Sequence, residues 1–233
     1  MSHSDYTAES LARYLHLSPQ QVAKLAERGQ LPGRKVSGEW RFSGPEIHRW
    51  FENRIGVSGE AELLDVENVL RRSNPAHAAD VSIAELLPLE AIAVPLLART
   101  RNSVIDSMAE LAAATGMLWD ARAMADAVRA REDMHTTALE NGVALLHPRR
   151  PMAQFLSEPI LALGCTTCGI PFGQNVPLSD VFFLVCSMED AGHLRVLARL
   201  SRVLAAPGFL NGLHQAEDAH AARELIIEVE SKL

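Results

Sequence analysis

The apolar positions of the chain follow two different patterns. Residues 81–233 contain short runs that are apolar at nearly every position, and the clearest are 143–146, 160–164 and 181–186. Such runs are typical of strands covered on both faces. Between them lie segments with apolar residues three and four positions apart, which predict helices. Strands and helices alternating in this way predict an α/β/α sandwich, a mixed sheet flanked by helices on both faces.

The boundaries of these elements can be placed from caps and breakers. We expect helices at 103–115, 120–131, 190–205 and 218–232. Asp190 is the expected N-cap of the third helix. A further strand is expected at 91–97, where Pro95 indicates an edge position or a bulge.

Residues 6–54 show short amphipathic helices and a hairpin instead. The first helix can be capped by Thr7, and the second starts at Ser18, where a Ser and a Gln three residues apart form a capping box with Pro at the first helical position. The second helix ends at Gly29. Two short helices with so brief a connection have helix-turn-helix spacing.

The hairpin that follows, residues 34–42, is basic. A two-residue turn at Ser37-Gly38 places Arg34 opposite Arg41 on one face. Like charges in this position destabilise a hairpin unless an anion lies there, and a phosphate backbone would qualify. A second capping box, at Ser43, then starts a third helix.

Helix, turn, helix, basic hairpin and helix in this order resemble the excisionase-type winged helix-turn-helix, over about fifty residues. The resemblance implies DNA binding, with base edges read from the start of the second helix and phosphates held by the hairpin. The residues expected to contact DNA are Gln20, Gln21, Lys24, Arg34, Lys35 and Arg41. Because so small a domain binds DNA weakly on its own, a homodimer or tandem DNA sites would be required. The alternative is that these charges only solvate the domain.

Charge and composition support two modules. Residues 1–55 carry eight Lys and Arg against six acids, a balance of +2, so the remainder must carry −9 to give the chain's −7. A basic head on an acidic body suggests different partners for residues 1–55 and 81–233. Residues 56–80 are expected to form a linker, in which a short helix at 60–72 packs on a domain in preference to forming a dimer seam.

Several classes of protein are disfavoured. No apolar run approaches the roughly 20 residues of a membrane span, and the first residues lack the features of a signal peptide. We therefore expect a cytoplasmic protein without membrane insertion. Three cysteines argue against a disulfide framework. For Cys165 and Cys168, two free thiols in a turn are favoured over a redox pair or a metal site.

The stretch richest in candidate chemistry is 140–151. Its apolar run follows an Asn141-Gly142 turn signal and ends at His147, with Arg149 and Arg150 just beyond. An imidazole at the end of a buried strand, beside two fixed positive charges, is well placed to take up and release an anion. The two arginines either steer an acidic partner or solvate the strand end.

Motifs around this stretch resemble the enzyme IIA domains of the bacterial sugar phosphotransferase system, in the fructose, mannitol and nitrogen-regulatory branch. The family has an Arg-Glu pair, a Ser/Thr-Thr step and then the run Gly-Ile-Ala-Ile-Pro-His. This chain has Arg131-Glu132, Thr136-Thr137 and the run from Gly142 to His147, and His193 matches a second family histidine. The resemblance covers roughly residues 82–232. Leu146 and Pro148 depart from the family, which has Pro and usually Gly there.

The resemblance implies that His147 accepts a phosphoryl group from a histidine phosphocarrier protein or a related donor, clamped by Arg131 and His193. A helix start suits both an anion and a neutral imidazole at His193. No cofactor is expected, and the chain has no Walker-type glycine loop for direct use of ATP.

Three functions fit these observations. The preferred one is a phosphohistidine-carrying regulator, a phosphotransferase if active, that couples the phosphoryl group to DNA binding. The departures at Leu146 and Pro148 favour, as an alternative, a domain that senses a ligand or partner without being phosphorylated and regulates transcription. A third is a sugar-transport phosphocarrier whose head docks proteins.

Overall fold

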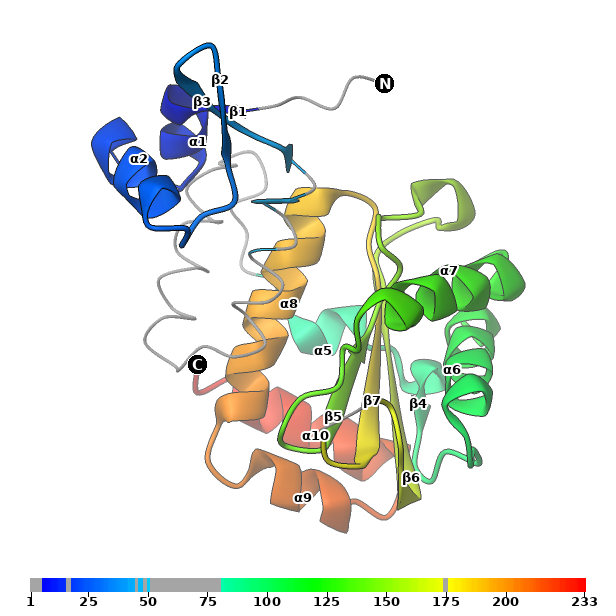
Figure 1. The fold of residues 1–233 in the computed structure, drawn as a ribbon. Helices are drawn as coiled ribbons and strands as arrows, with labels where there is room; N and C mark the ends of the chain where they lie inside the picture. Colours follow the sequence, from blue (N-terminus) through cyan, green and yellow to red (C-terminus); the bar gives the residue numbers. More distant parts are fainter. Residues whose placement is uncertain (1–5, 16–17, 45, 48–49, 51–80, 174–175) are drawn as a thin grey trace. The chain divides into compact units, whose positions relative to one another are not determined.

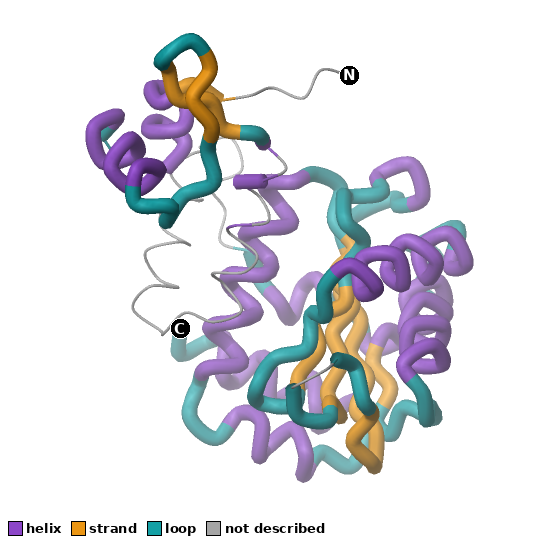
Figure 2. Tube along the Cα trace, in the orientation of Figure 1, coloured by secondary structure: helices purple, strands orange, loops and turns teal. Residues whose placement is uncertain are grey.

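The computed structural model describes residues 6–15, 18–44, 46–47, 50, 81–173 and 176–233. The chain divides into two compact units, Met1–Val81 and Ser82–Leu233, called here the first and second units. Figures 1 and 2 show the helices and strands of each. The helix predicted after Ser43 falls largely outside the described residues, and the linker helix predicted at 60–72 falls entirely outside them.

In the described part of the first unit, helices α1 and α2 accompany a three-stranded antiparallel sheet of order β1-β3-β2. The hydroxyl of Thr7 caps the first helix by accepting the Ser10 N–H at 3.2 Å. The capping box predicted at Ser18 and Gln21 is present. The elements are β1 (Tyr6–Thr7), α1 (Ala8–Leu15), α2 (Pro19–Glu27), β2 (Arg34–Val36) and β3 (Glu39–Phe42).

The hairpin of this unit has the predicted register. Arg34 pairs with Arg41 across the two strands. Ser37 and Gly38 form the turn with positive φ angles of 51° and 86°, the backbone of a two-residue hairpin turn with the twist of its strands. The short strand β1, which no sequence pattern indicated, adds a third strand beside β3.

The second unit is built on a four-stranded sheet of order β4-β6-β7-β5. β6 and β7 are antiparallel, whereas β4 and β5 run parallel to their neighbours, so the sheet is mixed. β5 and β7 are buried along almost their whole length, as their continuous apolar sequences predict. The strands are β4 (Ile92–Ala93), β5 (Val143–Leu146), β6 (Ile160–Ile170) and β7 (Ser179–Cys186).

Helices cover both faces of this sheet (Figure 1). α6 and α7 lie on one face and α8 on the other, with α5 and α10 in contact with α8. The α/β fold with a mixed sheet flanked by helices is therefore confirmed. The helices are α5 (Ile83–Leu86), α6 (Arg101–Ala114), α7 (Ala121–Met134), α8 (Asp190–Ala205), α9 (Phe209–Gln215) and α10 (Ala219–Glu230), with short 3₁₀ turns η2 (Leu89–Ala91) and η3 (Ala153–Phe155).

Three details differ from the predictions. The strand expected at 91–97 shrinks to the edge strand β4, because η2 precedes it and the chain turns at Val94-Pro95. The N-cap of α8 is Glu189 rather than Asp190, and the Glu189 side chain makes no capping hydrogen bond. α9 lies between α8 and α10, where the sequence showed only a Pro207-Gly208 break.

The last helix is joined to the start of the second unit by a buried carboxylate. Glu230 of α10 accepts hydrogen bonds from the Ile83 N–H at 2.7 Å and the Ala84 N–H at 3.0 Å. It also accepts from the Ser82 hydroxyl at 3.0 Å and from Arg199 Nε of α8 at 3.2 Å. Its side chain is 9% exposed. One carboxylate thus ties α5, α8 and α10 together.

Replacing this carboxylate should destabilise the second unit. We expect Glu230→Gln to lower the free energy of unfolding by about 2–4 kcal/mol, because it removes a buried ion-pair partner and turns an acceptor into a donor facing two N–H groups. Denaturant unfolding of the full chain followed by far-UV circular dichroism would measure the change. Glu224→Gln, an exposed substitution on the same helix, is the control. Equal stabilities of the two variants would contradict the structural role of Glu230.

Candidate functional site

The site begins where β5 ends. Leu146 is the last residue of the strand, and His147 follows with its side chain 3% exposed. The ring nitrogen Nδ1 of His147 lies 2.8 Å from the carbonyl oxygen of Leu145. Since a carbonyl oxygen can only accept, Nδ1 carries a proton. In the neutral ring the lone pair is therefore on Nε2.

The second histidine comes from the first turn of α8. The His193 backbone N–H donates to the Glu189 carbonyl at 3.0 Å, and the side chain is 5% exposed. Nδ1 of His193 lies 3.3 Å from the hydroxyl oxygen of Ser187, a buried residue directly after β7. β7 lies next to β5 and parallel to it, so the chain segments after both strands emerge at one edge of the sheet.

The fold brings the two histidines together across 45 intervening residues. Their ring centroids are 4.9 Å apart, with an angle of 57° between the planes. Both rings are tied at Nδ1, one to a carbonyl and the other to a hydroxyl. Each ring is therefore anchored through Nδ1.

The Arg-Glu pair predicted from the sequence lies at the end of α7. Arg131 Nη1 donates to the His135 carbonyl at 2.7 Å, and the side chain is buried. Glu132 accepts hydrogen bonds from both the N–H and the hydroxyl of Thr137. The Leu145 N–H in turn donates to the Thr137 carbonyl at 3.2 Å. These contacts hold the loop after α7 against β5, the strand that directly precedes His147.

Burial of the site was not expected from the sequence. Nε2 is buried in both His147 and His193. Arg149 and Arg150, by contrast, are exposed just beyond His147. The strand end thus presents two cations to solvent while it holds the imidazole inside.

Residues 85–229 match the family described as phosphoenolpyruvate-dependent sugar phosphotransferase system, EIIA 2. The chain belongs to this EIIA type-2 family. The match includes His147, His193 and Arg131, and it covers most of the second unit. Residues 6–55 separately match a helix-turn-helix domain.

Curated relatives align with the EIIA type-2 part of the chain. The fructose-specific EIIA component of Haloferax volcanii is 28% identical over 150 residues, which are 63% of this chain and 96% of that protein. A nitrogen regulatory protein of Bradyrhizobium diazoefficiens is 32% identical over 146 residues, 60% of this chain and 90% of that protein. The fructose-specific EIIABC component of Bacillus subtilis is 28% identical over 152 residues, which are 63% of this chain but only 23% of that protein.

Solved structures show the same fold. The nitrogen regulatory protein IIA-Ntr of Neisseria meningitidis aligns with a TM-score of 0.55 at 20% identity, over 62% of this chain and 98% of that one. A complex of enzyme IIA mannitol with phosphorylated enzyme IIB mannitol from Escherichia coli aligns with a TM-score of 0.52 at 17% identity, over 61% and 99%. These likenesses concern the fold alone. Among the described residues, no helix is both long and apolar enough to cross a membrane.

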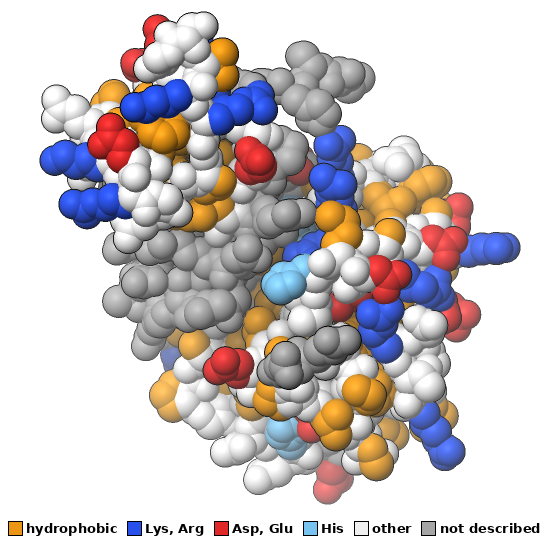
Figure 3. Space-filling view, in the orientation of Figure 1, with side chains coloured by type: hydrophobic (Ala, Val, Ile, Leu, Met, Phe, Trp, Pro, Cys, Tyr) orange, Lys and Arg blue, Asp and Glu red, His pale blue; other side chains and the backbone are white. Residues whose placement is uncertain are grey.

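The residues predicted to contact DNA lie on α2 and on the β2–β3 hairpin. Gln20 and Lys24 are exposed on α2. The side-chain carbonyl of Gln21 accepts the Ser18 N–H at 2.8 Å, so it is committed to the helix cap. Arg34 and Lys35 are exposed on β2. Figure 3 shows Lys and Arg side chains spread over the visible face of this unit with acidic side chains among them.

Part of the hairpin charge is balanced within the protein. Arg41 Nη2 donates to Glu39 at 2.9 Å, and Lys35 Nζ lies 5.2 Å from the centre of the Trp40 ring. Glu39 therefore supplies an anion that the sequence argument assigned to a phosphate backbone. Both contacts are exposed and contribute little to stability.

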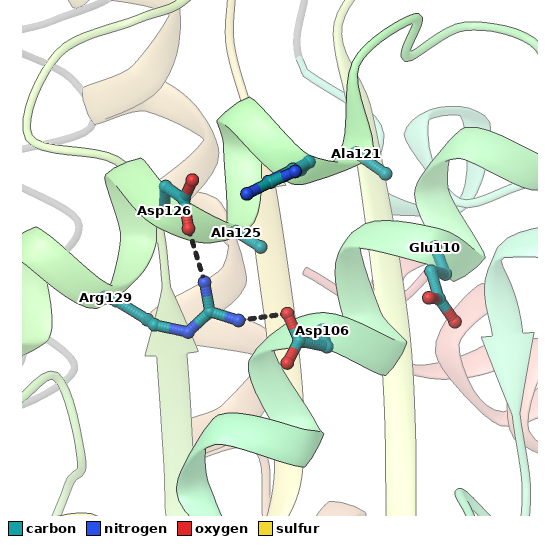
Figure 4. Close-up of a pocket in the computed structure, with 7 residues that line it drawn as sticks. Asp106, Glu110, Ala121, Ala125, Asp126 and Arg129 are labelled. Carbon is teal, nitrogen blue, oxygen red and sulfur yellow. Dashed lines mark hydrogen bonds and ion pairs between the residues drawn. The ribbon is translucent and has the colours of Figure 1, made fainter.

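A groove of about 510 Å³ lies between α6 and α7, away from the residues predicted for the site. Figure 4 shows Arg129 bonded to Asp126 of its own helix and to Asp106 of α6. The Arg129–Asp126 distance is 2.7 Å. The charges in this groove connect the two helices, and we assign it a structural role.

The Cys-x-x-Cys pair lies within β6 rather than in a turn. All three cysteines are free, and among the described residues no cluster of side chains could hold a metal ion. Burial, together with the charge of Asp180, raises the pKa of Cys165 to about 12, and burial alone raises the pKa of Cys186 to about 12. Cys168 is exposed.

These environments predict selective modification. The thiolate is the reactive form, so Cys165 and Cys186 should stay unreactive at pH 8 and Cys168 should react. We expect iodoacetamide to label only Cys168 in the folded protein and all three cysteines in denaturant, with peptide mass spectrometry as the measurement. Cys168→Ser should remove the native label. Labelling of Cys165 in the folded protein would contradict the burial described here.

Proposed function

We propose that this protein is a regulator of the phosphotransferase system that accepts a phosphoryl group on His147 and couples its phosphorylation state to DNA binding. The observation that carries the proposal is the hydrogen bond from His147 Nδ1 to the Leu145 carbonyl. It leaves the lone pair of the neutral ring on Nε2, and a neutral imidazole nitrogen is a nucleophile near neutral pH.

The proposed reaction is a transfer between two histidines. Nε2 of His147 attacks the phosphorus of a phosphohistidine carrier, and a new N–P bond forms as the donor's N–P bond breaks. The electron pair of the broken bond stays on the donor nitrogen, and the proton on Nδ1 of His147 stays on that nitrogen, donated in the hydrogen bond to the Leu145 carbonyl. The protein therefore needs no cofactor or metal for this step.

The transferring group carries charge on three equatorial oxygens, and fixed donors that stabilise it provide most of the catalysis in such reactions. His193, with its ring 4.9 Å from that of His147, is the first donor we assign. Arg131 is the second, supported by its place at the end of α7, whose following loop is bonded to β5. Arg149 and Arg150, both exposed, would attract an acidic or phosphorylated partner.

The described conformation gives a phosphodonor no access to His147. Nε2 of His147 is buried, so a donor protein must displace neighbouring groups before its phosphorus can reach this atom. Docking that opens the site would make transfer dependent on recognition of the donor. It would also keep water from the phosphohistidine between transfers.

Two features support a regulatory function over sugar uptake. The EIIA type-2 residues share the chain with a helix-turn-helix match. One relative is named as a nitrogen regulatory protein, although another is a fructose-specific component. We infer that the phosphoryl group acts as a signal read by the first unit, for which DNA is the proposed partner.

A second candidate is supported by the same burial. A domain that senses a ligand or partner without being phosphorylated has no need of an open nucleophile, and Leu146 and Pro148 flank His147 where the family pattern differs. This candidate regulates transcription with an unmodified His147. The phosphorylation assay below separates the two.

We expect His147→Ala to abolish phosphorylation of the full chain by phosphoenolpyruvate and the general phosphocarrier proteins, because the substitution removes the only atom assigned as acceptor. Incorporation of labelled phosphate would measure it. His220→Ala, an exposed histidine substitution in α10, should leave labelling unchanged. An unlabelled wild-type chain would favour the sensory domain, and equal labelling of His147→Ala would end the assignment of His147.

DNA binding makes a separate prediction for Arg34. We expect Arg34→Ala to weaken binding to duplex DNA at low salt and to reduce the slope of log affinity against log salt by about 1, because one phosphate contact is lost. Fluorescence anisotropy with a labelled duplex would measure both quantities. Arg122→Ala, an exposed substitution in α7 with the same change of charge, is the control. If the wild-type chain fails to bind any duplex at low salt, the first unit is a protein-docking module.

A further inference from the structure

Ser187 occupies a position that neither the sequence motifs nor the reaction just described uses. It follows β7 directly, is 3% exposed, and lies six residues before His193. Its hydroxyl oxygen is 3.3 Å from Nδ1 of His193. A buried hydroxyl beside a buried ring nitrogen constrains where the proton of that ring resides.

The two histidines are constrained by groups of different chemistry. The Leu145 carbonyl only accepts, so it fixes a proton on Nδ1 of His147 and leaves the lone pair on Nε2. The Ser187 hydroxyl can donate as well as accept. When it donates to Nδ1 of a neutral His193, the ring carries its proton on Nε2. It accepts from Nδ1 when His193 is doubly protonated, and Nε2 again carries a proton.

We propose that Ser187 is a positioning residue that keeps a proton on Nε2 of His193 in both charge states of the ring. His193 can then donate a hydrogen bond from Nε2 to an oxygen of the phosphoryl group, whereas His147 offers the lone pair that receives the phosphorus. One carbonyl and one hydroxyl thereby give two neighbouring imidazoles opposite roles. This inference rests on the proposed phosphoryl acceptance for its purpose, although the position of the proton can be tested without it.

The surrounding backbone holds both Ser187 and His193 in place. The His193 N–H is bonded to the Glu189 carbonyl at 3.0 Å, which sets the ring in the first turn of α8. Ser187 is held at the end of a strand whose register with β5 is continuous from Val143 to Leu146. The hydroxyl and the ring are therefore both fixed to rigid elements, so a hydrogen bond between them fixes the ring orientation as well as the proton.

The first measurement is the tautomer of His193 in the unphosphorylated full chain, by nitrogen-15 NMR at pH 8.5, about two units above the ordinary histidine pKa. Ser187→Thr and Ser187→Val form a matched pair, because the two side chains have nearly the same shape and only threonine has a hydroxyl. We expect the proton on Nε2 in the wild type and in Ser187→Thr, and a mixture of tautomers in Ser187→Val. A proton on Nδ1 in the wild type would overturn the proposal.

The second measurement is the rate of phosphoryl acceptance. We expect Ser187→Val to slow the transfer about tenfold, the effect of one neutral hydrogen bond on a transition state, with Ser187→Thr close to wild type. Ser179→Val, at a serine that is 0% exposed at the start of β7, controls for the cost of the substitution itself. Equal rates for the Thr and Val variants of Ser187 would overturn the proposal. If the wild-type chain accepts no phosphate, the proposed function fails, and the tautomer measurement still decides the assignment of Ser187.

Discussion

The hydrogen bond between His147 Nδ1 and the Leu145 carbonyl is the constraint on which the site depends. It is local, spanning two residues at the end of a strand, and it determines which nitrogen of the ring can react. The Glu132–Thr137 contacts fasten the preceding loop to β5, and the parallel pairing of β5 with β7 places His193 at the same edge of the sheet. The site is thus assembled from the end of β5, the loop after α7 and the first turn of α8.

The burial of His147 has two consequences. The His147 side chain, which is 3% exposed, is shielded from water. For the proposed phosphoryl transfer, the same burial would require a donor to open the site, which an exposed histidine would not need. The two functions considered for the chain differ at this point, because a phosphocarrier must open its site in each cycle and an unmodified sensory domain has no such requirement.

Local patterns in the sequence were sufficient to predict much of the fold. The continuous apolar runs located β5 and β7, a capping box located the start of α2, and the Ser37-Gly38 turn predicted the pairing of Arg34 with Arg41. The resemblance to enzyme IIA domains indicated His147, His193 and Arg131 as site residues. Features that depend on tertiary contacts could not be predicted in this way: β1 is two residues long, the edge strand β4 is shortened by the 3₁₀ turn before it, and α8 starts without a side-chain cap from Asp190. Ser187 and the burial of both imidazoles became apparent only when distant segments were brought together.

The carboxylate of Glu230 has a mechanical consequence. It accepts hydrogen bonds from Ile83 and Ala84, near the start of the second unit. It also bonds Arg199 on α8, the helix that contains His193. The chain enters the second unit at this point. Force applied to the chain at residue 81 would reach α8 through this carboxylate, while Arg223 of α10 also holds α5 through the carbonyls of Ala84 and Leu87. The path from the entering chain to the helix that carries His193 is therefore short, because one carboxylate bonds both.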